Sequence, residues 1–269
     1  MSKARELAFR YDLFITPDWR DRFDTLVNEN IEIPFESRVL DVNCGTGAHS
    51  IELAERARGK GEVVGIDPAA EQIELARAKA LARKLENVTF QRGIATVLSF
   101  PDNGFDIVIG DASMLAPSDI EGVLTELVRV AKPEGRVVLK MATRGSFDEF
   151  FSIYWEALMS AELIDGVWAD LEQLINERRT ISDSELIARQ AGLRNVKSLS
   201  SREEFSFETG EAFLTFPLIE DVFLADWMAI VPESRRSEVR ERLVSIIDRE
   251  RHGGPFEVSI KATVLSGKK

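Results

Sequence analysis

A short loop between two predicted elements carries the residues best suited to bind a ligand. The apolar run 38–42 ends in N-C-G-T-G, and small and apolar residues at helical spacing follow from residue 48. Gly45 and Gly47 let a ligand approach the backbone, and the next helix presents free N–H groups in its first turn. Asp41 stands at the strand end, where a carboxylate suits an ammonium group better than a pyrophosphate.

A second acid follows the next predicted strand. Asp67 comes 26 residues after Asp41, and in a doubly wound sheet an acid at this place accepts hydrogen bonds from ribose hydroxyls. The loop and Asp67 together indicate an adenosine-like ligand. Gly45-x-Gly47-x-x-Ser50 nearly matches the dinucleotide-binding pattern, so a nucleotide-dependent oxidoreductase is an alternative, although Ser50 replaces the third glycine.

Strand and helix patterns alternate in the first half of the chain. Short apolar runs predict strands, and apolar residues at helical spacing predict helices between them. The strands are expected over 38–42, 62–66, 88–91, 105–109 and 136–141, and the helices over 48–58, 69–85 and 118–131. Five strands alternating with such helices predict an α/β fold with a doubly wound, mostly parallel sheet and helices on both faces.

The alternation is interrupted in three places. Residues 1–36 read as two amphipathic pieces with a turn at Pro17 and Asp18, and we expect this helical segment to lie over the site. Residues 37–269 then form one domain, with aromatic-rich insertions over about 142–180 and 201–255. We expect these insertions to cap the site and line an apolar acceptor pocket; the alternative is that their aromatic residues only pack the cap.

Composition excludes several classes of protein. The 269 residues carry 34 Lys and Arg against 46 Asp and Glu, a net charge of −12, which argues against a broad nucleic-acid or anionic-membrane surface. One Cys and two His rule out a disulfide framework and argue against a metal site. There is no apolar run long enough for a signal or a membrane span, so a cytoplasmic location is expected.

Four motifs, in order and at the right spacing, resemble those of the class I S-adenosylmethionine-dependent methyltransferases. They are R-V-L-D-V-N-C-G-T-G, V-V-G-I-D-P-A-A-E-Q-I-E-L-A-R, F-P-D-N-G-F-D-I-V-I-G-D-A and L-V-R-V-A-K-P-E-G-R-V-V-L. The resemblance covers about residues 36–142 and is closest to the small-molecule enzymes of the ubiquinone/menaquinone methyltransferase type. It implies a Rossmann-like sheet of seven strands, the last of them antiparallel, and S-adenosylmethionine as the cofactor.

The resemblance also implies roles for individual residues. Asp41 would hold the amino group of the methionine moiety, Gly45 and Gly47 would line the methionine and ribose, and Asp67 would bind the ribose hydroxyls. The remaining expected cofactor contacts are Asn43, Pro68, Gln72, Ile94, Ala95, Asp111 and Tyr11.

Two positions depart from the family pattern. Asn43 stands where the family usually has glycine, and asparagine is the side chain that best tolerates a positive φ. Ile94 stands where an acid often binds the adenine amino group, so we expect weaker or less adenine-selective binding, while the backbone of Ala95 can still donate to the ring.

The reaction needs alignment of the acceptor more than covalent help, and a base only if the acceptor must lose a proton. The candidate catalytic residues are Asp111, His49 and His252. We therefore expect methyl transfer from S-adenosylmethionine to a small, partly apolar molecule, with the acceptor, the atom methylated and the oligomeric state left open. A non-catalytic protein that binds S-adenosylmethionine or S-adenosylhomocysteine is the other alternative.

Overall fold

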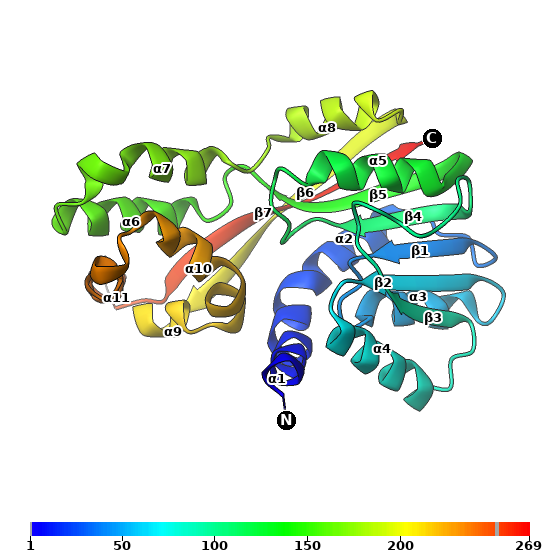
Figure 1. The fold of residues 1–269 in the computed structure, drawn as a ribbon, viewed down its shortest axis with the longest axis horizontal. Coiled ribbons are helices and arrows are strands. Elements are labelled where there is room, and N and C mark those ends of the chain that lie inside the picture. Colours follow the sequence, from blue (N-terminus) through cyan, green and yellow to red (C-terminus); the bar gives the residue numbers. More distant parts are fainter. Residues whose placement is uncertain (1, 251–252) are drawn as a thin grey trace. The chain divides into compact units, whose positions relative to one another are not determined.

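The computed structural model describes residues 2–250 and 253–269 and contains one seven-stranded sheet (Figure 1). The strand order is β3-β2-β1-β4-β5-β7-β6. The strands are β1 (Arg38–Val42), β2 (Glu62–Asp67), β3 (Val88–Arg92), β4 (Phe105–Asp111), β5 (Ala131–Thr143), β6 (Arg194–Phe207) and β7 (Phe256–Lys268). The first five pair in parallel, as expected for strands joined by crossover helices.

β7 runs against its neighbour β5. The backbone of Lys269, just beyond β7, bonds to Glu134 and Gly135 near the start of β5, whereas Ser259, near the start of β7, accepts from Phe147 just after β5. The predicted α/β fold, with a mostly parallel sheet and an antiparallel last strand, is therefore confirmed.

The chain divides into two compact units. The first comprises residues 2–142, 180–201 and 262–269, and the second comprises the described residues of 143–179 and 202–261. Helices of the first unit are α1 (Lys3–Arg10), η1 (Tyr11–Arg20), α2 (Asp21–Asn30), α3 (Ala48–Ala57), α4 (Ala70–Ala82), α5 (Ile120–Val130) and α8 (Ile181–Gln190).

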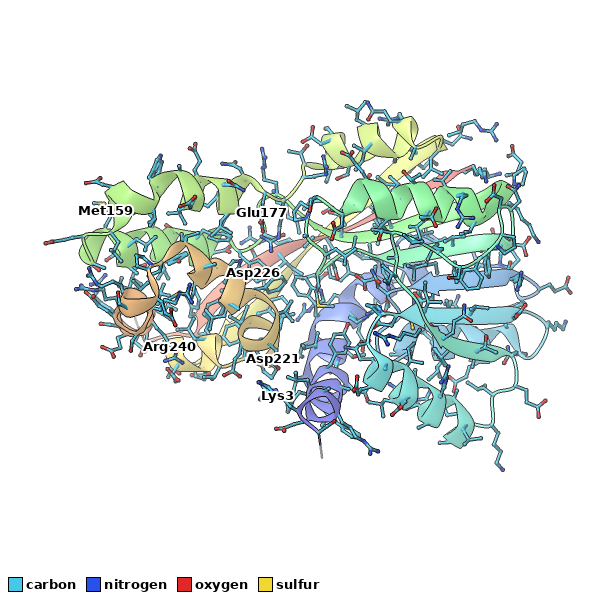
Figure 2. All side chains as sticks on the ribbon, viewed as in Figure 1. Lys3, Met159, Glu177, Asp221, Asp226 and Arg240 are labelled. Atoms are coloured by element: carbon cyan, nitrogen blue, oxygen red, sulfur yellow. The ribbon has the colours of Figure 1, made fainter. Side chains whose placement is uncertain are left out.

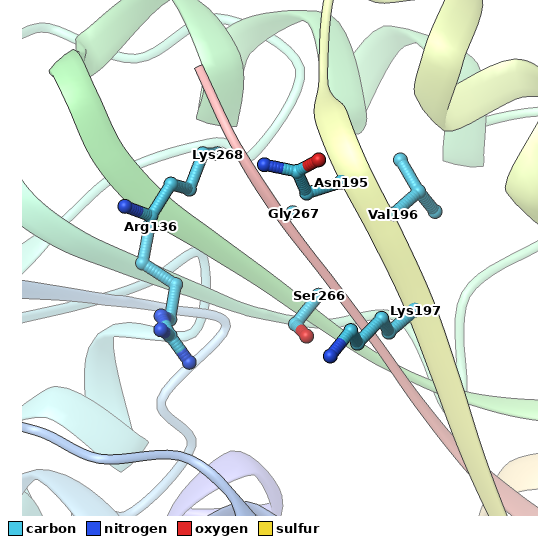
Figure 3. A pocket seen from close by; sticks show the side chains of 7 residues that line it. All are labelled: Arg136, Asn195, Val196, Lys197, Ser266, Gly267 and Lys268. Carbon is cyan, nitrogen blue, oxygen red and sulfur yellow. The ribbon is translucent and has the colours of Figure 1, made fainter.

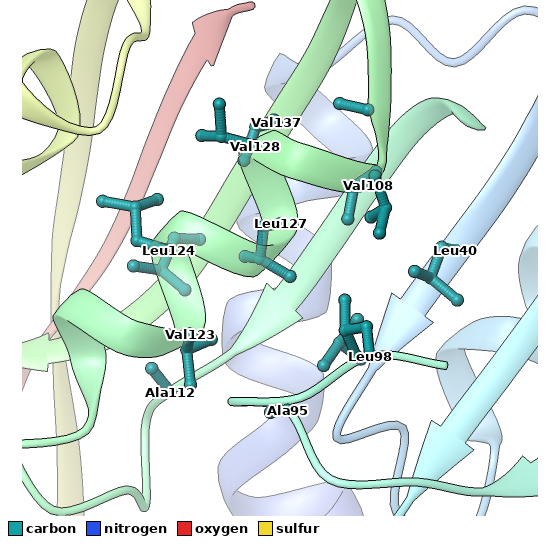
Figure 4. Close-up of a cluster of buried hydrophobic side chains, with 14 of the residues drawn as sticks. Leu40, Ala95, Leu98, Val108, Ala112, Val123, Leu124, Leu127, Val128 and Val137 are labelled. Atoms are coloured by element: carbon teal, nitrogen blue, oxygen red, sulfur yellow. The ribbon is translucent and has the colours of Figure 1, made fainter. Parts of the chain in front are cut away.

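Alternating side chains give the sheet of the first unit two hydrophobic layers. On one face Leu40 and Val108 pack under α5, where Leu124 and Leu127 are fully buried (Figure 4). On the other face, Val39, Ile107 and Val138 pack with residues of α2, α3 and α4. Asp41, Asp111 and Lys140 each lie two residues after a member of this second layer, namely Val39, Ile109 and Val138. By the alternation of a strand they therefore point to the same face, which α2 covers.

The N-terminal segment differs from the prediction. Instead of a turn at Pro17 and Asp18, helix continues from α1 through the π-helical stretch η1 into α2. Proline removes only one N–H donor, and the wider π-helical turn, with Asp21 N–H bonded to the carbonyl of Thr16, accommodates it. Ile15 and Trp19 of this stretch are buried, which shows that packing overrode the local turn signal.

The second unit has an aromatic core of its own. It contains α6 (Asp148–Ser160), α7 (Ile164–Asn176), α9 (Gly210–Leu214), η2 (Ile219–Phe223), α10 (Leu224–Trp227), η3 (Met228–Ile230), η4 (Glu233–Arg235) and α11 (Arg236–Glu250). Phe150 stacks on Trp227 with ring centroids 4.6 Å apart and also contacts Phe213. The hydroxyl of Tyr154 donates to the carbonyl of Trp227.

The outer surface of this unit carries both polar and apolar side chains. Arg240 on α11 forms a two-pronged hydrogen bond with Glu211 on α9, whereas Met159 on α6 is apolar and nearly half exposed (Figure 2). The buried aromatic rings of the insertions therefore hold the helices of their own unit together. That other residues of the insertions line an acceptor pocket stays a prediction.

Gly110 of β4 is required by the packing of α5. A Cβ atom built there would lie 2.6 Å from Cδ1 of Leu127, which is too close for a real contact. We expect Gly110→Ala to lower the free energy of unfolding by about 1–3 kcal/mol through overpacking. Urea denaturation followed by circular dichroism measures this change.

Gly122→Ala is the matched control, because Gly122 lies on α5, the helix against which Gly110 packs, and its Cβ would meet only Thr96 at an ordinary 3.5 Å. It should leave stability unchanged or raise it by up to about 1 kcal/mol through helix propensity. Equal destabilisation by both substitutions would contradict the packing argument.

Candidate functional site

The loop after β1 is held in a left-handed conformation. Asn43 has φ 59°, Gly45 has φ 58° and Gly47 has φ 78°, so the expectation that Asn43 can adopt a positive φ is confirmed. The Asn43 side chain donates to the backbone carbonyl of Asp111, with Nδ2 and O 2.8 Å apart. Asparagine thus joins the ends of β1 and β4, which glycine could not do.

Asp67 joins this loop to the loop after β2. Its Oδ2 accepts from the Gly45 N–H and its Oδ1 from the Ala69 N–H, both at 2.9 Å. Burial raises the pKa of Asp67, although these two hydrogen bonds and Arg20 act in the opposite direction. Each carboxylate oxygen can accept a further hydrogen bond, so the side chain remains able to bind hydroxyl groups.

The glycine loop lies directly under the N-terminal segment. A Cβ at Gly45 would lie 2.8 Å from Nη1 of Arg20 and 2.9 Å from Cε1 of Tyr11. At Gly47, it would lie 2.7 Å from Phe90 and 2.8 Å from Ala76. Both glycines are therefore needed for close approach as well as for their backbone conformation.

Arg20 connects the N-terminal segment to β4. Its Nη1 donates to the hydroxyl of Tyr11 at 2.8 Å, and its Nη2 lies 3.1 Å from Oδ2 of Asp111 without the alignment of a hydrogen bond. Ser113 donates to Oδ1 of Asp111 through both its N–H and its hydroxyl, and that hydroxyl accepts from the indole of Trp19.

These partners set the protonation of the cluster. Burial alone would raise the pKa of Asp111, but Arg20, Lys140 and the two hydrogen bonds from Ser113 outweigh it and lower the pKa to about 2. Burial raises the pKa of Tyr11 to about 12 against the opposing effect of Arg20. At neutral pH, Asp111 is therefore ionised and Tyr11 keeps its proton.

Lys140 of β5 is a fully buried cation. Its Nζ donates to Oδ1 of Asp24 on α2 at 2.6 Å and lies 3.4 Å from Oδ2 of Asp111. Burial acts to lower the pKa of Lys140, but the two carboxylates more than compensate and raise it. His49 completes the group, with Nδ1 3.4 Å from the same Asp24 oxygen and Nε2 3.4 Å from Oδ1 of Asn28.

One carboxylate oxygen of Asp41 accepts no hydrogen bond from the described residues. Its Oδ2 accepts from the hydroxyl of Ser50 at 2.6 Å, whereas Oδ1 is buried and has no hydrogen-bond partner among the described residues. An unpaired buried carboxylate oxygen is costly unless a ligand satisfies it. This acceptor beside the glycine loop fits the amino group expected there.

A cleft of about 230 Å³ opens next to this cluster. It is lined by Tyr11, Arg20, Asn43, Asp67, Pro68, Ala69, Gln72, Asp111, Met114 and Leu115. Six residues predicted from the sequence are thus brought together, namely Tyr11, Asn43, Asp67, Pro68, Gln72 and Asp111. Their roles toward a cofactor stay predictions.

The other predicted residues lie outside the lining of this cleft. Asp41 is buried beneath it, Gly45 is covered by Tyr11 and Arg20, and Ala95 is buried in the hydrophobic layer under α5. Ile94 is 62% exposed, and its expected effect on adenine binding stays a prediction.

Of the two histidine candidates, the structure describes only one. His49 is buried between Asp24 and Asn28 and is not among the residues that line the cleft, so its catalytic role stays a prediction. His252 lies outside the described residues.

Sequence reasoning missed Arg20, Asp24 and Lys140. Lys140 did carry a signal, since a charged residue within the apolar strand V-V-L-K-M must find a buried partner. Arg20 and Asp24 carried none, because charged residues on an amphipathic helix ordinarily face water.

The Asp24–Lys140 pair generates a stability prediction. Asp24→Asn leaves the Lys140 ammonium buried with only the more distant Asp111, so we expect a loss of about 3–5 kcal/mol in the free energy of unfolding. The double variant Asp24→Asn with Lys140→Met should recover most of this loss, as measured by urea denaturation.

Glu185→Gln is the control, because it breaks only the surface pair with Arg189 on α8 and should cost no more than about 0.5 kcal/mol. Equal losses in Asp24→Asn and Glu185→Gln would show that the buried pair is unimportant.

Comparison with known proteins agrees with the geometry. A family described as a methyltransferase domain matches residues 36–163. A demethylmenaquinone methyltransferase of Thermus thermophilus is 37% identical over 164 residues, which cover 57% of this chain and 72% of that protein. Another from Anoxybacillus flavithermus is 35% identical over 137 residues, covering 51% and 56%.

The YcgJ protein of Bacillus subtilis has a similar fold, with a TM-score of 0.62 and 22% identity over 93% of this chain and 98% of that one. The chain spans only a little over half the length of several curated relatives it matches, at 56–57%. The family resemblance of the four motifs is confirmed. The chain belongs to the class I S-adenosylmethionine-dependent methyltransferases.

Proposed function

We propose that this protein transfers a methyl group from S-adenosylmethionine to a small, partly apolar acceptor. The observation that carries the proposal is the unpaired buried oxygen of Asp41 beneath the glycine loop, next to a cleft that runs from Asp67 to Asp111. Family membership supplies the chemistry, and these groups supply the binding site.

In this proposal each end of the cofactor meets a group of matching charge or hydrogen-bonding capacity. Oδ1 of Asp41 accepts from the amino group, and Asp67 accepts from the ribose hydroxyls. Pro68 and Gln72 lie beside the base. Arg20 lies against Gly45 of the glycine loop and lines the cleft, and it pairs with the carboxylate of the methionine moiety.

The charge of the cluster suits a cationic cofactor. Asp24, Asp41 and Asp111 carry three negative charges, and Arg20 and Lys140 carry two positive ones, so one negative charge remains before Asp67 is counted. A bound sulfonium, with its own amino and carboxylate groups, brings one net positive charge to this place. Because the cluster is buried, this attraction is only weakly screened by salt.

The bound cofactor supplies an activated methyl group, so the protein has to orient the acceptor and exclude water. Asp111 is a poor general base, because Arg20 and Ser113 engage its carboxylate and its pKa is lowered to about 2. We propose that it positions groups in the cleft. Tyr11 keeps its proton, and because its hydroxyl accepts from Arg20, its O–H can still donate a hydrogen bond to an acceptor oxygen.

The first acceptor to test is the one in the names of the relatives, demethylmenaquinone. The apolar side chains of Met114 and Leu115 line the cleft beyond Asp111 and suit a partly apolar ring. The expectation that the two insertions cap the site also stays a prediction. Release of S-adenosylhomocysteine with this acceptor would support the proposal; binding without turnover on any quinone-like or phenolic acceptor would favour a non-catalytic binding protein.

We place the protein in the cytoplasm as part of the same proposal, since its one cysteine, Cys44, is free and buried as in a reducing compartment. Within residues 2–250 and 253–269, none of the helices is long and apolar enough to cross a bilayer.

The cofactor site itself is tested by Asp41→Asn. An amide cannot pair with an ammonium group as a carboxylate does, so affinity for S-adenosylmethionine should fall about 10–100-fold, equivalent to about 1.5–3 kcal/mol. Calorimetric titration with S-adenosylmethionine, S-adenosylhomocysteine and NAD in turn measures this, and wild type should bind the two sulfur ligands and not NAD.

Asp170→Asn on exposed α7 is the control and should bind as wild type does. Unchanged affinity in Asp41→Asn would show that Asp41 does not bind the amino group of the cofactor. Binding of NAD by wild type would instead favour the nucleotide-dependent oxidoreductase.

Ile94 tests the adenine end of the site. Its side chain is exposed and can accept no hydrogen bond, so Ile94→Asp should tighten binding of S-adenosylhomocysteine by roughly 1–3 kcal/mol if the adenine amino group reaches it. Ile94→Asn, which adds an acceptor without charge, should tighten it less. No change in either variant would place the adenine elsewhere.

A further inference from the structure

A groove of about 430 Å³, separate from the cofactor cleft, lies on strands β5, β6 and β7, where β6 begins and β7 ends (Figure 3). It is lined by Arg136 at the start of β5, by Asn195, Val196 and Lys197 at the start of β6, and by Ser266, Gly267 and Lys268 at the end of β7. Because β7 is antiparallel, its end lies with the starts of β5 and β6. Arg136 precedes Lys140 by four residues, which is about 13 Å along the strand.

Most side chains that line the groove point to the sheet face opposite α5 and α8, whereas Val196 packs toward those helices. Val137 and Leu265 pack under α5 and α8, so Arg136 and Ser266 point to the opposite face by alternation. On that face, Val138 and Val264, the next inward positions, are still packed in the hydrophobic layer of α2, α3 and α4. At the groove, polar residues replace the apolar ones, which is typical of a face that meets solvent or a polar ligand.

Most polar groups of the groove have no protein partner. The side chains of Arg136, Lys197, Asn195 and Ser266 form no hydrogen bond or ion pair with the described residues. Lys268 approaches Glu134 at a distant 3.9 Å, and Glu134 is itself bonded to Arg194. Donors without partners therefore converge from three neighbouring strands.

This concentration of positive charge is unusual for the chain. The protein carries a net charge of −12, and many of its other cations are paired with acids. A guanidinium group offers a two-pronged donor that matches phosphate oxygens, and the lysines, the hydroxyl and the amide add donors around it.

We propose that this groove binds a phosphate-bearing small molecule at a site separate from the cofactor cleft. The Arg136 fork and the Lys197 ammonium provide the charge, and Ser266 and Asn195 provide neutral hydrogen bonds. Such a ligand would bind independently of S-adenosylmethionine, because no residue of the groove lines the cofactor cleft.

The test is calorimetric titration with inorganic pyrophosphate at low ionic strength, with the groove variant Arg136→Gln/Lys197→Gln. Wild type should show saturable binding, and the groove variant should bind at least tenfold more weakly. The matched control is Lys60→Gln/Lys84→Gln, which removes the same charge from two side chains that also have no acid partner among the described residues, and it should bind as wild type does.

Several outcomes would overturn the proposal. The first is no binding of pyrophosphate by wild type, and the second is equal weakening in the control variant. The third is that the groove variant loses binding to phosphatidylglycerol vesicles while pyrophosphate does not bind at all, which would assign the groove to a lipid headgroup. Titration with S-adenosylhomocysteine should be unchanged in both variants, so a failure here is separable from a failure of the proposed methyl transfer.

Discussion

The burial of charge at the carboxyl ends of the strands is the constraint on which the rest of the site depends. Neighbouring strands β2, β1, β4 and β5 end in or near Asp67, Asp41, Asp111 and Lys140. By strand alternation the last three point to one face of the sheet. Such groups are expensive to remove from water unless each is paired. The N-terminal segment supplies Arg20 and Asp24, so it completes the site electrostatically as well as covering it.

This arrangement explains why the glycine loop has no room for larger side chains. Gly45 is pressed between Asp67, which accepts its N–H, and the side chains of Tyr11 and Arg20 above it. Asn43 fixes the same loop to the end of β4. Oδ1 of Asp41 is left without a hydrogen-bond donor among the described residues, so the site is preorganised around one missing positive partner.

The strands and helices over residues 38–142 could be predicted because local signals and tertiary packing agree there. The apolar runs of the sequence coincide with the strands. The positive φ of Asn43 could be expected because asparagine tolerates this conformation better than other non-glycine residues. The turn at Pro17 failed because buried Ile15 and Trp19 hold the segment helical. Arg20 and Asp24 could not be predicted, since their partners are distant in sequence and become neighbours only when the segment docks on the sheet.

That distance has a consequence for how the protein reaches its native state. Asp24 and Lys140 are 116 residues apart, so their bond is among the contacts of high sequence separation that slow folding. During synthesis, the segment that neutralises the sheet emerges first and must wait for β5 before it can dock. Until then both groups stay hydrated, and the parallel sheet has little to gain by closing around an unpaired lysine. Maturation of the binding site is thereby tied to completion of the central sheet.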